Sequence, residues 1–131
     1  METEKTLIIM VDDNLTSLQT GKNVLSEKYR VATAPSAEKL FSLLANNKPA
    51  LIILDIDMPE MDGYETIKVL KSRPDTRNIP IIFLTGKTEV DNRLQGYSLG
   101  AVDYITKPFD PEALKQRVEK NLAFEDLEID I

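Results

Sequence analysis

The chain has 131 residues, and its 22 acidic and 16 basic side chains give a formal net charge of −6. It contains no cysteine, histidine or tryptophan, which excludes thiolate and imidazole catalysis and metal sites with sulfur or nitrogen ligands. A bound metal would therefore need oxygen ligands, which Mg²⁺, Mn²⁺ and Ca²⁺ prefer. The acidic balance, without a cluster of basic residues, argues against direct nucleic-acid binding.

Short apolar runs alternate with longer segments of helical periodicity, over a length that suits one domain. The apolar runs predict strands at 7–11, 30–33, 50–54, 81–84 and 101–106. The periodic segments predict helices over 15–29, 36–44, 64–70, 88–97 and 110–122, with Ser36, Thr88 and Asp110 as N-terminal caps. The first, third and fourth runs are apolar throughout, which is typical of parallel strands covered on both faces, whereas the run at 30–33 fits an edge strand.

This alternation predicts an α/β fold of the (βα)₅ type. We expect a doubly wound, flavodoxin-like parallel sheet of five strands in the order 2-1-3-4-5, with helices on both faces. Residues 6–123 form the predicted domain, residues 1–5 an N-terminal extension, and residues 124–131 an acidic tail that is a linker or the start of a longer helix. Because no run reaches 18 apolar residues and the first residues are charged, we expect a cytoplasmic protein without a membrane segment.

The side chains that can carry chemistry share one position, the carboxyl end of a predicted strand. They are Asp12, Asp13, Asp55, Asp57, Thr85 and Lys107. Ligands bind at this edge of doubly wound sheets, next to the point where the strand order reverses. Since the first and third strands are predicted neighbours about 4.8 Å apart, Asp12, Asp13 and Asp55 should converge.

The converging carboxylates need a counter-ion, because two of them about 5 Å apart repel by roughly 3 kcal/mol at an effective dielectric constant near 20. Three carboxylates and the ammonium of Lys107 leave a charge of −2, which one bound Mg²⁺ would neutralise. Magnesium in such a site keeps positions for phosphoryl oxygens, an arrangement that suits phosphoryl transfer. Asp55 is the best candidate nucleophile, Lys107 the second positive group, and the Thr85 hydroxyl and Gly86 N–H would bind a phosphoryl group.

Four motifs occur in the chain: VDDN at 11–14, LIILDIDMPEMDGYE at 51–65, FLTG at 83–86 and GAVDYITKPF at 100–109. In this order and spacing they resemble the receiver domains of two-component response regulators. The resemblance implies that Asp55 accepts a phosphoryl group from a sensor histidine kinase or a histidine phosphotransfer protein, and that the domain later hydrolyses its own acyl phosphate. The resemblance therefore implies that the domain is phosphorylated and dephosphorylated itself and is not an enzyme that turns over an external substrate.

The same resemblance implies a role for each remaining site residue. Mg²⁺, or Mn²⁺ as a substitute, would be bound by Asp13, Asp55 and the backbone carbonyl of Asp57, with Asp12 helping directly or through water. Thr85 and Tyr104 would form the switch, and Lys107 would precede a cis peptide bond to Pro108. The helix from Thr88, the fifth strand and the helix from Asp110 would present the face that contacts a downstream effector domain or protein.

Two departures from the family pattern lead to hypotheses. Asp57 and Lys87 carry opposite charges beside the acceptor, and their pairing would hinder attacking water and modestly lengthen the phosphorylated lifetime. Val102-Asp103 and Gln95 stand where receivers of winged-helix transcription factors carry some of the charged residues through which they pair, which argues against that dimer mode.

Other functions compete with this interpretation. The Asp55-Ile56-Asp57 string is also similar to the nucleophile motif of haloacid-dehalogenase-type phosphatases, but that function leaves Asp12 and Asp13 unexplained. A flavodoxin-like FMN module would need a phosphate loop where the two aspartates stand. A degenerate receiver acting as a protein-binding scaffold is the third alternative. Taken singly, each site residue also fits an ordinary cap, turn or packing role, and it is their combination that favours the receiver.

Overall fold

The computed structural model describes residues 5–86 and 97–130. The strands are β1 (Thr6–Val11), β2 (Tyr29–Ala34), β3 (Leu51–Asp55), β4 (Ile81–Thr85) and β5 (Asp103–Thr106). The helices are α1 (Leu15–Leu25), α2 (Ala37–Leu44), α3 (Gly63–Ser72) and α5 (Pro111–Asp130). The helix expected from Thr88, together with Lys87 and Gln95, lies outside the described residues.

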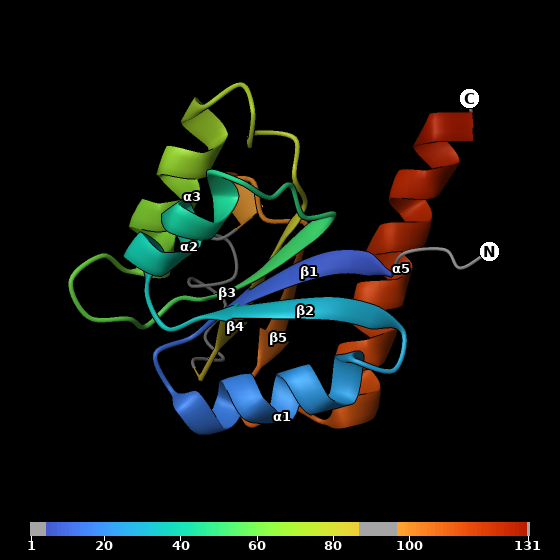
Figure 1. The fold of residues 1–131 in the computed structure, drawn as a ribbon, viewed down its shortest axis with the longest axis horizontal. Helices are drawn as coiled ribbons and strands as arrows, with labels where there is room; N and C mark the ends of the chain where they lie inside the picture. The colour runs from blue at the N-terminus through green and yellow to red at the C-terminus, as the bar shows by residue number, and fades with distance from the viewer. Residues whose placement is uncertain (1–4, 87–96, 131) are drawn as a thin grey trace.

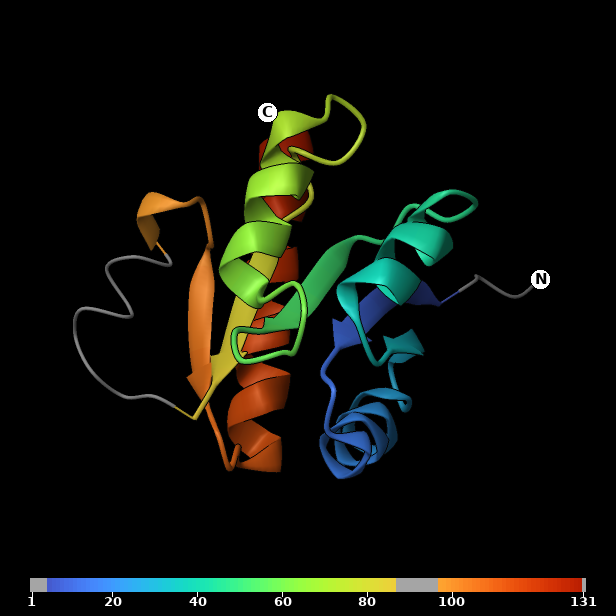
Figure 2. The ribbon, with the colours of Figure 1, turned by 90° about the vertical axis from the view of Figure 1, so that its left-hand side faces the viewer.

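The five strands form one parallel sheet in the order β2-β1-β3-β4-β5, which confirms the predicted fold. Helices α1 and α5 cover one face of the sheet, and α2 and α3 cover the other (Figures 1 and 2). Within the described ranges, no helix has the combination of length and apolarity that crossing a bilayer requires.

The central strands are apolar along most of their length because each face of the sheet lies under a helical layer. In β1, Ile9 packs on the α2 and α3 side, whereas Ile8 and Met10 pack on the α1 and α5 side. The same alternation holds in β3, where Ile52 and Ile53 belong to opposite cores. Burial on both faces removes the polar alternation of a half-exposed strand, which explains why short continuous runs mark these strands.

Capping residues fix where the helices begin. Ser36 caps α2 through its side chain, which accepts a hydrogen bond from the Lys39 N–H, and the Asp110 carboxylate accepts one from the Ala113 N–H at the start of α5. Both caps agree with the sequence prediction. Backbone of helical geometry continues through residues 124–130, the acidic segment.

Candidate functional site

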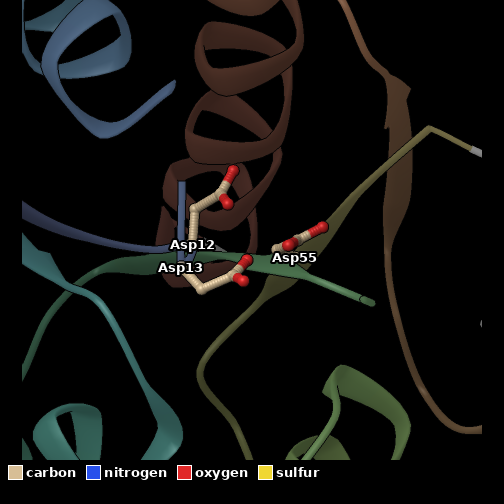
Figure 3. Close-up of side chains that lie close together, drawn as sticks. All are labelled: Asp12, Asp13 and Asp55. Atoms are coloured by element: carbon tan, nitrogen blue, oxygen red, sulfur yellow. The ribbon is translucent and has the colours of Figure 1, made fainter. Parts of the chain in front are cut away.

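Three aspartates meet where β1 and β3 end side by side. Parallel pairing places Val11 opposite Leu54, so that Asp12 and Asp13, which follow β1, lie next to Asp55, the last residue of β3. One carboxylate oxygen of each aspartate lies within 4.8 Å of the others, and Figure 3 shows the three groups gathered at this edge. Asp12 and Asp55 are buried, whereas Asp13 is exposed. The predicted convergence of the carboxylates is therefore present.

Lys107 brings a positive charge to the two buried carboxylates. Its ammonium lies 2.8 Å from Asp12 Oδ2 and 3.5 Å from Asp55 Oδ1. The backbone N–H of Lys107 donates a hydrogen bond to the Thr85 carbonyl, which ties the residue to the end of β4. The peptide bond from Lys107 to Pro108 is cis, as the family resemblance implies.

The cluster is not neutralised by this single cation. Burial and the negative charge of Asp12 raise the pKa of Asp55 to about 7, against the opposing effects of Lys107 and the Asp57 N–H. Burial lowers the pKa of Lys107, but the two carboxylates outweigh this effect and hold it above its usual value. Asp12 Oδ2 and Asp55 Oδ1 accept no hydrogen bond of good geometry from the described residues, although both face the Lys107 ammonium.

These buried oxygens make the residues fit a hard divalent cation. The buried oxygens Asp12 Oδ2 and Asp55 Oδ1 lie beside the Lys107 ammonium and next to the exposed carboxylate of Asp13. The three carboxylates form an oxygen-only donor set of the kind that Mg²⁺ prefers. The three carboxylates also carry more negative charge than the single positive charge of Lys107 can balance. Asp57 is itself exposed, and its backbone N–H donates to the Asp55 carboxylate, so its peptide lies at the same edge.

The other predicted site residues lie on the two strands beyond β3. Thr85 is buried at the end of β4, one residue past the pairing of Leu84 with Asp55. Gly86 follows it, exposed, with open space where a side chain would stand. Tyr104 lies in β5 and is 6% exposed, packed with the core on the α2 and α3 side.

The sequence did not predict the polar network that Asp103 of β5 forms with α5. Asp103 is 4% exposed, and its carboxylate accepts hydrogen bonds from the Arg117 guanidinium, the Asn121 amide and the Tyr104 N–H. Arg117 and Asn121 stand four residues apart on α5, so they reach the same carboxylate from successive turns. Helical spacing relates these two residues to each other, but no local pattern relates them to Asp103.

The comparisons with known proteins agree with this fold. The family model of the response regulator receiver domain matches residues 8–119. The chain belongs to the response regulator receiver family.

Three relatives show the range of proteins that contain similar domains. The chain is 42% identical over 115 residues to a Vibrio cholerae protein named probable cyclic di-GMP phosphodiesterase, covering 88% of the chain and 26% of that protein. It is 36% identical over 125 residues to the probable transcriptional regulator ycf27 of Porphyra purpurea, covering 93% of the chain and 49% of that protein. The solved structure of chemotaxis response regulator CheY4 of Vibrio cholerae matches with a TM-score of 0.83 and 27% identity, over 88% of the chain and 98% of CheY4. The chain thus spans between a quarter and a half of these two curated relatives.

Proposed function

We propose that Asp55 accepts a phosphoryl group from a phosphohistidine on a sensor histidine kinase or a histidine phosphotransfer protein. A carboxylate oxygen attacks phosphorus, the new O–P bond forms as the P–N bond breaks, and the imidazole leaves with its proton. The donor is a partner because this chain contains no histidine. The observation that carries the proposal is the buried carboxylate of Asp55 at the sheet edge, with a second buried carboxylate and the Lys107 ammonium beside it.

The same edge fits Mg²⁺, or Mn²⁺ in its place. Asp13, Asp55 and the backbone carbonyl of Asp57 would hold the ion, with Asp12 helping directly or through water. A bound dication supplies positive charge against the phosphoryl oxygens and removes the repulsion among the carboxylates. Without it, an incoming phosphoryl group would meet a cluster in which the pKa of Asp55 is already raised by its neighbours.

Lys107, Thr85 and Gly86 bind the phosphoryl group in this proposal. The Lys107 ammonium moves from the carboxylates to a phosphoryl oxygen, a shift that its 3.5 Å separation from Asp55 makes short. The Thr85 hydroxyl donates a hydrogen bond to another oxygen from the neighbouring strand. The Gly86 N–H is reachable because no side chain stands over it. Water later attacks phosphorus, the bond between phosphorus and the Asp55 oxygen breaks, and inorganic phosphate leaves, which restores the Asp55 carboxylate.

Phosphorylation becomes a signal through Thr85 and Tyr104. The new charge favours arrangements in which these residues close on the site, which changes the face of β5 and α5 that a downstream effector contacts. A hollow of about 390 Å³ lies on this face, lined by residues that include Tyr97, Tyr104 and Arg117. The chain thus acts on itself in the cytoplasm and turns over no external substrate.

Labelling by a small phosphodonor tests the proposal. Acetyl phosphate with Mg²⁺ should add one phosphoryl group per chain, measured by intact mass, and a chelator should abolish the addition. Asp55→Asn should remain unlabelled, whereas Asp75→Asn, a matched change of an exposed aspartate, should be labelled like the parent chain. Labelling that persists in Asp55→Asn, or that ignores the chelator, would refute the proposal. Turnover of small phosphate esters would instead support the phosphatase alternative.

A further inference from the structure

Helix α3 begins directly against the backbone of the proposed phosphoacceptor. Gly63, its first residue, is buried, and a Cβ atom placed on it would lie 2.5 Å from the Asp55 carbonyl oxygen and 2.8 Å from Ile56 Cα. Both atoms belong to the main chain, so no flexible side chain can move aside to make room. A hydrogen bond also holds the two elements together, because the Gly63 N–H donates to the Ile56 carbonyl at 2.9 Å.

The two sides of this contact are held by separate sets of interactions. On the helix side, Ile67 and Leu70 are fully buried against the sheet. Asp62 and Glu65 form a reciprocal capping box that fixes the first turn. On the strand side, Ile56 donates its N–H to the Leu84 carbonyl at 3.0 Å, which continues the pairing of β3 with β4. Neither element can retreat without losing its own packing or ladder bonds.

The loop at 57–61 joins the two elements and contains no helix or strand, although Met58 is buried in the core. Asp57, its first residue, donates its backbone N–H to the Asp55 carboxylate and carries the carbonyl proposed as a metal ligand. Glu60 adopts a φ of 68°, in the left-handed region that non-glycine residues rarely occupy. A displacement of α3 relative to Ile56 would therefore be taken up by this already constrained loop, and the Asp57 peptide would move.

We propose that Gly63 is a positioning residue, whose missing side chain lets α3 abut β3 and thereby sets the Asp57 carbonyl and the Asp55 carboxylate at one spacing for a divalent cation. The inference rests on the proposed function, since it concerns the same site. Gly63 would support cation binding without contacting the ion or the phosphoryl group.

The first test compares Gly63→Ala with Gly100→Ala. Gly100 has a φ of +109°, so alanine there is strained as well, but it lies before β5, at the end of the strand opposite the aspartates. We expect Gly63→Ala to weaken Mg²⁺ binding about tenfold or more, as loss of a supporting residue does at metal sites. Gly100→Ala should lower the free energy of unfolding and leave the Mg²⁺ dissociation constant unchanged. Magnesium titration followed by backbone amide NMR measures both variants, and an unchanged constant in folded Gly63→Ala would overturn the proposal.

A second pair of variants applies even where Gly63→Ala does not fold. Asp62→Ala and Asp62→Asn remove the same charge, but only asparagine keeps a side chain that can cap α3. The proposal predicts weaker Mg²⁺ binding in Asp62→Ala than in Asp62→Asn, and equal constants would contradict it. A parent chain that binds no Mg²⁺ would refute the proposed function itself, whereas normal binding in the parent and in the α3 variants alike would refute only the role of Gly63.

Discussion

In the absence of a metal, the ionised Asp55 carboxylate destabilises the fold, and Asp55→Asn should therefore raise the free energy of unfolding. The pKa of Asp55 is about 7 in the folded chain, against an ordinary value of 3.8. Between these values the folded state binds a proton that the unfolded state has released, so stability falls as the pH rises from about 4 to about 7. Three pKa units at about 1.4 kcal/mol each give a cost of about 4 kcal/mol above that range.

Asparagine removes this charge but keeps a polar group in a buried place. An incompletely paired amide costs about 1–3 kcal/mol, so the net gain at pH 8 should be about 2 kcal/mol. Urea unfolding in the presence of a chelator measures it, at pH 8 and at pH 5. The advantage of Asp55→Asn should shrink at the lower pH, where the parent carboxyl is mostly protonated in the folded state.

Asp75→Asn is the control, because Asp75 is exposed and its replacement should change the unfolding free energy by less than about 0.5 kcal/mol at either pH. Equal stability of Asp55→Asn and the parent chain at pH 8 would refute the reasoning. An advantage that does not depend on pH would also refute it, because the gain would then not arise from the carboxylate charge.

Three further predictions follow from other contacts. Arg117→Ala leaves the Asp103 carboxylate, which is 4% exposed, without its guanidinium partner. Urea unfolding should show a free energy of unfolding lower by about 3 kcal/mol. A loss below about 1 kcal/mol would show that this ion pair does not stabilise the fold. Lys107→Ala should slow labelling by acetyl phosphate about a hundredfold, because one preorganised charge is lost from the reacting group, and parent-like labelling would contradict its assigned role. Leu15, 70% exposed beside the aspartates, should contact a protein phosphodonor. Leu15→Ala should therefore slow transfer from a phosphohistidine protein about fivefold, the equivalent of about 1 kcal/mol, and leave labelling by acetyl phosphate unchanged. Equal effects on both donors would argue against such a contact.

The strand order and the meeting of the aspartates could be predicted because both follow from general rules of parallel sheets. Continuous apolar runs identify strands buried on both faces, and their carboxyl ends share one edge, so Asp12 and Asp55 had to converge once β1 and β3 were neighbours. The strand boundaries were less accurate. The fifth run was expected from residue 101, but β5 starts at Asp103. Gly100 takes a positive φ, and the exposed Val102 donates its N–H to the Ile81 carbonyl just before the residue pairing with β4 begins at Asp103.

Contacts between residues that no helical or strand period relates could not be predicted. The bond between Asp103 and Arg117 depends on where α5 crosses the sheet, which periodicity does not specify. The close approach of Gly63 to Asp55 could not be predicted either, since a glycine after a capping residue also fits an ordinary helix start. The proposed pairing of Asp57 with Lys87 stays a prediction, because Lys87 lies outside the residues that the structure describes.

The central claim is that a carboxylate oxygen of Asp55 captures phosphorus at the acidic edge of the sheet. Peptide mass spectrometry after labelling with acetyl phosphate and Mg²⁺, with the acyl phosphate reduced by borohydride so that its position is kept, tests this most directly. We predict a single modified residue at position 55. A modification at Asp12, Asp13 or Asp57, or on a hydroxyl group such as that of Thr85, would contradict the assignment of the phosphoacceptor.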